Sequence, residues 1–258
     1  MTMKSFNNYS AYYNLLYQDK DYKAEALYVH QLIQKWNPGA KTILNLGCGT
    51  GKHDLLLAEM GYALVSIDLS QTMIDIAKLE NTHSNIEYHV GDVRDFEFNR
   101  QFDVVVSLFH VMSYQTTIEE LSAAFRTAKN HLVINGAFIF DCWYGPGVVA
   151  DPPKHVKKNV EDQNIRVQRK TTPFQIPEKN IVKVQFEVKV EEKNTSIKNI
   201  FEEIHPMRYW FNEEIQSIAS QSGLSRVEYY KWMTLKKPIY KDWYIVNILK
   251  KINEENID

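Results

Sequence analysis

The stretch that decides the fold is Leu44-Asn45-Leu46-Gly47-Cys48-Gly49-Thr50-Gly51. It closes a short apolar run that begins at Thr42 and is typical of a strand, and residues 52–60 after it are typical of a helix that Gly61 ends. Three of the chain's ten glycines fall within residues 47–51, where they permit a tight turn and let a ligand approach the backbone closely. The order of strand, glycine loop and helix predicts a βα unit with a binding site at its loop.

Strand and helix signals then alternate along the chain. Apolar runs at 63–67, 86–90, 102–108 and 137–140 predict four further strands, and runs at 227–234 and 243–249 predict two more. Ser70 starts a predicted helix that extends to Glu80, and Thr116 and Thr117 each precede a glutamate by three residues, which indicates a capping box. Continuous apolar strands that alternate with helices favour a parallel sheet covered on both faces. We therefore predict an α/β fold: a Rossmann-like, doubly wound, mostly parallel sheet of about seven strands.

The pattern changes after Gly145-Pro146-Gly147. Apolar and polar residues alternate at 164–172, 181–190 and 198–209, which predicts long antiparallel strands with one solvated face. We predict a cofactor-binding domain over residues 1–145 and 210–258, and an inserted antiparallel module over 146–209 on the substrate side. Because the insertion interrupts the α/β order after Asp141, we expect it to cap the carboxyl ends of the parallel strands.

The spacing of the glycines limits the choice of ligand. Asp68 lies 21 residues after Gly47 and ends the next strand, where a carboxylate can accept hydrogen bonds from a ribose diol. The pattern Gly-x-Gly-x-Gly, with Lys52 in the sixth place, fits neither the dinucleotide nor the P-loop fingerprint.

Together with residues 65–70, 91–93 and 102–106, the glycine stretch resembles class I S-adenosylmethionine-dependent methyltransferases, over roughly residues 10–145. Asn45 stands where many members of that family have Asp or Glu. The resemblance implies S-adenosylmethionine as cofactor, with the three glycines on its methionine side and Asp68 on its ribose. It also implies that Leu69 and Met73 pack on the adenine, and that Asp92 accepts a hydrogen bond from the adenine amino group with Val93 beside it. The predicted cofactor-binding residues are Tyr22, Gly47, Cys48, Gly49, Gly51, Asp68, Leu69, Met73, Asp92, Val93 and Leu108.

A narrower resemblance concerns small-molecule N-methyltransferases that act on nucleotide-linked amino sugars. It rests on Tyr13-Asn14-x-x-Tyr17, Lys20-Asp21-Tyr22 and Arg208-Tyr209-Trp210, although Asn14 replaces the usual Asp. It implies that the N-terminal tyrosines close over the cofactor and the substrate.

Methyl transfer requires mainly an in-line approach of the nucleophile, and a neutral amine or a hydroxyl must also lose a proton. The candidate acceptors of that proton are His110, Tyr13 and Tyr17. His110 follows the fourth strand, at the edge of the sheet where ligands bind, and imidazole suits proton transfer at neutral pH. The alternative is that His110 only lines the pocket or bonds a backbone carbonyl.

Composition narrows the class of protein and its partners. The chain has 258 residues, of which 44% are hydrophobic and 24% charged, values typical of a globular protein. Two cysteines fit a reducing cytoplasm, and the polar N-terminus and lack of an apolar run of 18 residues predict neither a signal peptide nor a membrane span. The net charge of −2 gives no reason to expect nucleic acid, and no His-x-x-x-His spacing suggests a metal site.

The charge is unevenly distributed. Residues 1–153 hold 11 Lys/Arg and 17 Asp/Glu, whereas residues 154–210 hold 12 and 8, and residues 226–251 hold 7 and 2. We expect a small-molecule acceptor that carries negative charge, methylated on nitrogen rather than oxygen. Two alternatives stay open: a non-catalytic sensor of S-adenosylmethionine, and a methyltransferase for a macromolecule. The oligomeric state is also open, with a homodimer as one alternative.

Overall fold

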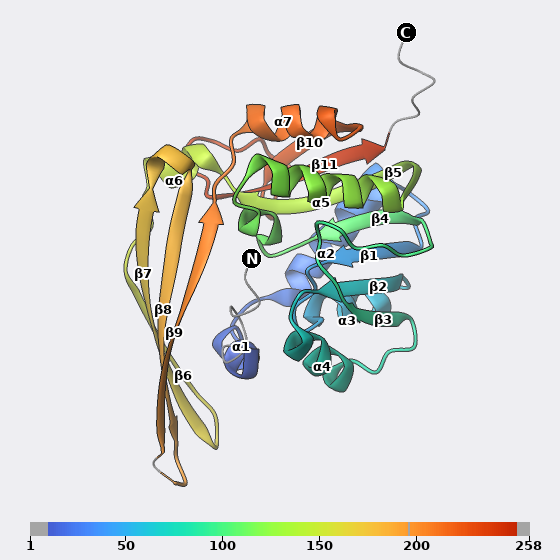
Figure 1. Ribbon diagram of the computed structural model, residues 1–258. Helices are drawn as coiled ribbons and strands as arrows, with labels where there is room; N and C mark the ends of the chain where they lie inside the picture. Colours follow the sequence, from blue (N-terminus) through green and yellow to red (C-terminus); the bar gives the residue numbers. More distant parts are fainter. Residues whose placement is uncertain (1–9, 196, 252–258) are drawn as a thin grey trace.

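The computed structural model describes residues 10–195 and 197–251, so the outermost parts of the predicted domain bounds lie outside the described residues. Its strands form two separate sheets, which stand side by side in Figure 1. The seven-stranded sheet has the order β10-β11-β5-β4-β1-β2-β3, and β11 runs antiparallel to both of its neighbours. The four-stranded sheet has the order β6-β7-β8-β9 and is antiparallel throughout. The predicted fold class, including the mostly parallel seven-stranded sheet, is confirmed.

The elements follow the chain in this order: α1 (Ser10–Leu16), α2 (Tyr22–Trp36), β1 (Thr42–Leu46), α3 (Lys52–Glu59), β2 (Ala63–Asp68), α4 (Gln71–Glu80), β3 (Ile86–Val90), β4 (Phe102–Ser107), η1 (Val111–Tyr114), α5 (Ile118–His131), β5 (Leu132–Trp143), α6 (Gly145–Ala150), β6 (Val156–Glu161), β7 (Ile165–Ile176), η2 (Pro177–Lys179), β8 (Ile181–Glu192), β9 (Lys198–Arg208), α7 (Asn212–Gln221), β10 (Leu224–Lys231) and β11 (Tyr244–Lys251). None of the helices within this described part of the chain is both long and apolar enough to cross a bilayer.

Alternate residues of the central strands contribute to two hydrophobic cores, one on each face of the larger sheet. Val105 and Phe138 pack with apolar residues of α5 and α7 on one face. Val104 and Ile139 pack with α2 and α3 on the other. Both faces are therefore covered, which explains why these strands read as continuous apolar runs.

Local hydrogen bonds set the ends of the helices. The Thr117 side chain accepts from the backbone N–H of Glu120, and Ser70 accepts from the N–H of Met73, so both predicted caps are confirmed. The sequence predicts one helix over residues 9–36, and for the described residues 10–36 this prediction is wrong. The chain breaks between α1 and α2, where the carboxylate of Asp21 caps the second helix by accepting from the N–H of Ala24. The sequence predicts Asn212 as the N-terminal cap of α7, but Phe211 occupies that position.

The smaller sheet turns its apolar side toward the larger sheet. The four valines at even positions of β8 (Val182, Val184, Val188 and Val190) are buried, while Lys183 and Lys189 on the other side are exposed. This confirms the predicted alternation. Helix α1 lies between the two sheets (Figure 1), and Leu16 packs against the valines of the smaller sheet.

Candidate active site

A cavity of about 550 Å³ lies at the carboxyl ends of the parallel strands. The larger sheet contributes residues that follow β1, β2, β3, β4 and β5, and the smaller sheet contributes residues of β6, β7, β8 and β9. The inserted sheet therefore caps the edge where the glycine loop lies, as predicted. The sequence-predicted residues that line the cavity are Tyr13, Tyr17, Tyr22, Gly47, Cys48, Gly49, Asp68, Leu69, Met73, Asp92, Val93, Leu108 and His110.

The glycine loop presents its backbone to this cavity. Gly49 has a φ of +57°, and a Cβ at this position would meet no atom within 4 Å. Because Gly49 lines the cavity, the space that a side chain would fill is available to a ligand. Gly51 lies elsewhere: it is the residue before α3, with a φ of +72°, and a Cβ there would meet Tyr88 and Asn81 instead.

Asp68 organises the loop from the end of β2. One carboxylate oxygen accepts from the N–H of Gly49 at 2.9 Å, and the other accepts from the N–H of Ser70 at 2.9 Å. Burial raises the pKa of this carboxyl, and the two backbone N–H groups oppose that rise. A carboxylate has about four lone-pair sites, so two remain for a diol in the cavity.

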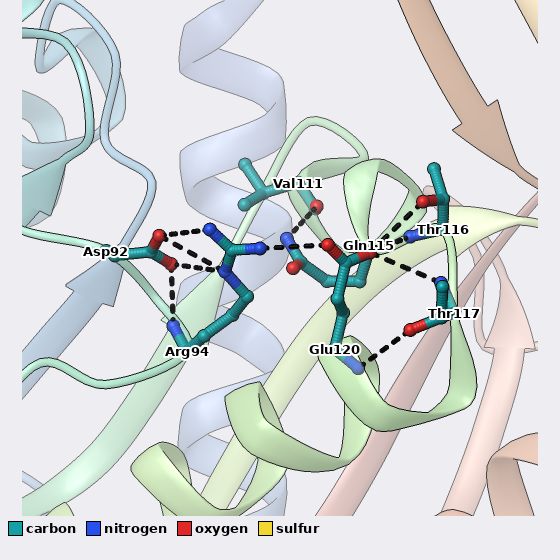
Figure 2. A network of polar contacts seen from close by, with 7 residues as sticks. All are labelled: Asp92, Arg94, Val111, Gln115, Thr116, Thr117 and Glu120. Atoms are coloured by element: carbon teal, nitrogen blue, oxygen red, sulfur yellow. Dashed lines mark hydrogen bonds and ion pairs between the residues drawn. The ribbon is translucent and has the colours of Figure 1, made fainter. Parts of the chain in front are cut away.

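Figure 2 shows how Asp92 is held. Its oxygens accept from Nε and Nη2 of Arg94 at 2.9 and 2.5 Å, and Nη1 of Arg94 donates to Glu120 at 2.8 Å. Burial works to raise the pKa of Asp92, but the guanidinium prevails and lowers it. Asp92 is thus a fixed, ionised acceptor at the rim, tied to the first turn of α5.

These groups suit an adenosine ligand. Leu69, Met73, Val93 and Leu108 give the cavity apolar lining, and the carboxylates of Asp68 and Asp92 line the same cavity. Adenosine combines a flat, largely apolar ring that has polar edge atoms with a ribose diol. The apolar lining suits the ring, and the two carboxylates can accept hydrogen bonds from the ring edge and the diol.

Tyr13 in α1 and Tyr17, the residue directly after α1, line the same cavity. The rings of Tyr13 and Tyr17 are 4.7 Å apart, and the ring of Tyr17 meets that of Phe109 edge-on at 5.2 Å. Asn14 fixes the helix: its amide donates to the Glu80 carboxylate at 2.8 Å and accepts from the Thr50 hydroxyl at 2.7 Å. An aspartate at position 14 would face the carboxylate of Glu80, which explains why an amide suits this chain.

His110 follows β4 in a strained turn. Phe109 and His110 both have left-handed backbone conformations, with φ of +64° and +66°. Such conformations cost of order 1–3 kcal/mol each and persist where surrounding contacts fix them. Here the buried carboxylate of Asp141 accepts from the N–H of His110 at 3.1 Å and lies 2.5 Å from its Nδ1. This leaves Nε2, on the opposite side of the ring, for the cavity.

The far end of the cavity is formed mainly by residues that the sequence did not single out. Val184, Phe186 and Met207 of the inserted sheet give it apolar walls. The indole N–H of Trp143 and the hydroxyl of Thr171 are buried there, and neither has a hydrogen-bond partner among residues 10–195 and 197–251. Unsatisfied buried polar atoms that line a cavity indicate a ligand with polar groups of its own.

Comparisons with known proteins agree with this geometry. Residues 43–136 match the family model described as "Methyltransferase domain". The chain is 30% identical over 220 residues to the dTDP-3-amino-3,4,6-trideoxy-alpha-D-glucopyranose N,N-dimethyltransferase of Streptomyces venezuelae, covering 84% of this chain and 90% of that protein.

Solved structures give the same result for the fold. The crystal structure of Streptomyces venezuelae DesVI is similar with a TM-score of 0.78 and 26% identity, over 93% of this chain and 98% of that one. The sugar N-methyltransferase KedS8 from a Streptoalloteichus species is similar with a TM-score of 0.79 and 23% identity, over 93% and 92% of the two chains.

Proposed function

The chain belongs to the S-adenosylmethionine-dependent methyltransferases, and from that premise we propose that it methylates the amino group of a sugar carried on a nucleoside diphosphate. The observation that carries the proposal is the similarity to a dTDP-amino-sugar N,N-dimethyltransferase along 90% of that protein's length, which includes the region of the inserted sheet. The cavity supports it, because its far end combines apolar walls with isolated polar atoms, as a deoxygenated sugar ring requires.

We assign the cofactor to the glycine-loop end of the cavity. Gly47 and Gly49 would face the methionine part, Asp68 the ribose, Leu69 and Met73 the adenine ring, and Asp92 the adenine edge. S-adenosylmethionine supplies an electrophilic methyl group on a sulfonium, so the protein has to hold an acceptor amine in line and exclude water.

The acceptor would lie between the two sheets. In this assignment residues 146–209 are the substrate-side module, and the remainder of the chain, 1–145 and 210–258, binds the cofactor. Tyr13 and Tyr17 cover the junction of the two ligands, and His110, whose Nδ1 lies beside the Asp141 carboxylate, orients the acceptor amine through Nε2. Arg169 and Lys154, which line the cavity from the inserted module, would favour an anionic acceptor.

A methyl-transfer assay tests the proposal. The purified enzyme is incubated with S-adenosylmethionine and one of three acceptors: a dTDP-linked 3-amino-deoxysugar, the same sugar without the nucleotide, or a peptide with a free N-terminus. We expect mass increases of one and then two methyl groups on the dTDP-linked sugar.

Calorimetry with S-adenosylhomocysteine separates the alternatives. Binding without transfer to any acceptor would favour a sensor of the cofactor, and preferential methylation of the peptide would favour a macromolecular substrate. Either outcome would contradict the proposed acceptor, whereas the membership of the family would stand.

A further inference from the structure

The inner side of β9 carries two titratable residues at positions where the alternation of the strand predicts apolar residues. Glu203 and His205 face the same way as the buried Met207, and their partners across the ladder on β8 are Phe186 and Val184. The exposed fraction is 8% for Glu203 and 1% for His205. A hydrophobic pair of similar volume is often as stable as or more stable than a buried ionic pair, so packing alone does not account for these residues.

Hydrogen bonds link these two residues to Tyr114 of η1, which follows β4 of the larger sheet. The carboxylate of Glu203 lies 3.2 Å from Nε2 of His205, and the Nδ1 of His205 lies 3.3 Å from the hydroxyl of Tyr114. A carboxylate can only accept, so Nε2 carries the proton and Nδ1 accepts from the Tyr114 hydroxyl. The order is therefore carboxylate, imidazole, phenol.

Tyr114 brings this chain of hydrogen bonds to the cavity. It ends η1, four residues after His110, and it lines the cavity together with Arg169 and Phe186. Because its hydrogen points toward His205, its oxygen can still accept a hydrogen bond from a ligand. Burial raises the pKa of Tyr114, as do the nearby Tyr17, Glu203 and Asp68, while Arg169 lowers it. A free phenolate is accordingly unfavourable there, and the phenol can take up a proton only by passing on its own.

We propose that Tyr114, His205 and Glu203 form a proton relay that receives the proton of the acceptor amine during methyl transfer. This rests on the proposed function. The nitrogen lone pair forms the bond to the methyl carbon as the carbon–sulfur bond breaks, with its electrons left on sulfur. The nitrogen then releases a proton to the oxygen of Tyr114, whose own proton moves to Nδ1 of His205. The resulting imidazolium is paired with Glu203, and it releases its extra proton to water after turnover, which restores the neutral imidazole.

In this scheme Tyr114 receives the proton, whereas His110 orients the amine. Tyr114 would touch the acceptor and is a catalytic residue in this scheme, whereas His205 and Glu203 act through it. Members of one relay act as a unit, so their losses do not add.

The test compares Tyr114→Phe, His205→Asn and the double variant. The Asn side chain can accept the hydrogen bond of Tyr114 at the place of Nδ1, but it cannot take up the proton. We expect each single variant to lose about 10²-fold in kcat, a typical size for acid–base catalysis, and the double variant to lose no more than the larger single loss. KM for the acceptor and the affinity for S-adenosylhomocysteine should change less than threefold. Glu203→Gln should give a smaller loss of kcat, because it keeps the hydrogen bond and removes the charge.

Tyr62→Phe is the matched control. Its hydroxyl lies 2.9 Å from Nδ1 of His30 in a second tyrosine–histidine pair, away from the residues that line the cavity. This variant should keep wild-type kcat. A readout independent of turnover is the ¹⁵N–¹H spectrum of the imidazoles, in which His205 should show the Nε2–H tautomer in the free enzyme.

Additive losses, unchanged kcat in both single variants, or an Nδ1–H tautomer of His205 would overturn the relay. If the wild-type enzyme methylates the amino sugar while these variants keep full activity, the relay fails and the proposed function stands. If the wild-type enzyme methylates no amine, the proposed function fails and the relay fails with it.

Discussion

At the scale of the residue, Asp68 carries the strongest expectation about cofactor binding. Its carboxylate holds the N–H groups of Gly49 and Ser70 and faces the cavity. Asp68→Ala should weaken the binding of S-adenosylhomocysteine by about 1–3 kcal/mol, since it removes the acceptor for the ribose hydroxyls. Calorimetry measures this, with Asp75→Ala as control, because Asp75 is an exposed carboxylate on the neighbouring helix. Unchanged affinity in a folded Asp68→Ala protein would refute the ribose assignment.

A second residue, Asp54, couples stability to pH. It is buried in the first turn of α3 and accepts from the amide of Asn45 at 2.6 Å. Burial raises the pKa of its carboxyl to about 6, although the hydrogen bond from Asn45 lowers it. The folded pKa exceeds the unfolded one, so ionisation of Asp54 destabilises the folded protein progressively as pH rises through the range from about 4 to 6.

Asp54→Asn should therefore raise the free energy of unfolding at pH 8 by about 1–3 kcal/mol, at 1.36 kcal/mol per pKa unit, and by much less at pH 4. Urea denaturation at the two pH values measures the difference. An equal gain at both would show that the pKa of Asp54 is the same in the folded and the unfolded protein.

Residues were predictable from sequence where the backbone alone fixes their position. The glycines and Asp68 follow directly from a strand, a turn and the next strand, so their proximity is a local property of a βα unit. Tyr114, Thr171 and His205 come together only because the inserted sheet packs over the cavity, and no spacing in the sequence records that packing. Gly51 belongs to the sequence motif, but the position that its Cβ would occupy faces Tyr88 instead of the cavity.

At the scale of the element, we expect substitutions in the loop between β1 and α3 to affect cofactor binding independently of stability. Gly49 and Gly61 both have positive φ, and a Cβ at either would meet no atom within 4 Å, but only Gly49 lines the cavity. Gly49→Val and Gly61→Val should thus suffer similar backbone strain, measured as a similar fall in melting temperature. Only Gly49→Val should lose binding of S-adenosylhomocysteine. Equal affinities for the two variants would show that the loop does not contact the cofactor.

Elements were predictable where apolar periodicity was strong. The central strands and α5 were read correctly because both the burial pattern and the caps are local. β6 was missed, since its sequence Val-Lys-Lys-Asn-Val-Glu belongs to an edge strand with mostly exposed side chains. The break between α1 and α2 was missed as well, because the aromatic residues on both sides of Asp21 suit either a continuous helix or two packed ones.

At the scale of the whole molecule, the uneven charge leads to the last prediction. The inserted module has a positive excess, with 12 Lys/Arg and 8 Asp/Glu over residues 154–210, and Lys154 and Arg169 line the cavity. Exposed charges are screened beyond about 8 Å at physiological ionic strength. KM for a dTDP-linked amino sugar should therefore rise with added salt while kcat changes little, and KM for the same sugar without its nucleotide should stay flat.

A pair of substitutions locates the effect. Lys154→Gln should raise KM for the nucleotide-linked acceptor and reduce its dependence on salt, since this lysine lies at the rim of the cavity. Lys183→Gln is the matched control, because Lys183 carries the same charge on the outer side of the sheet. Equal effects of the two would mean that the module acts only through its overall charge. A KM of the wild-type enzyme that does not change with added salt would contradict recognition of an anionic acceptor. The assignment of the cofactor site would remain, because it depends on Gly49 and Asp68 at the opposite end of the cavity.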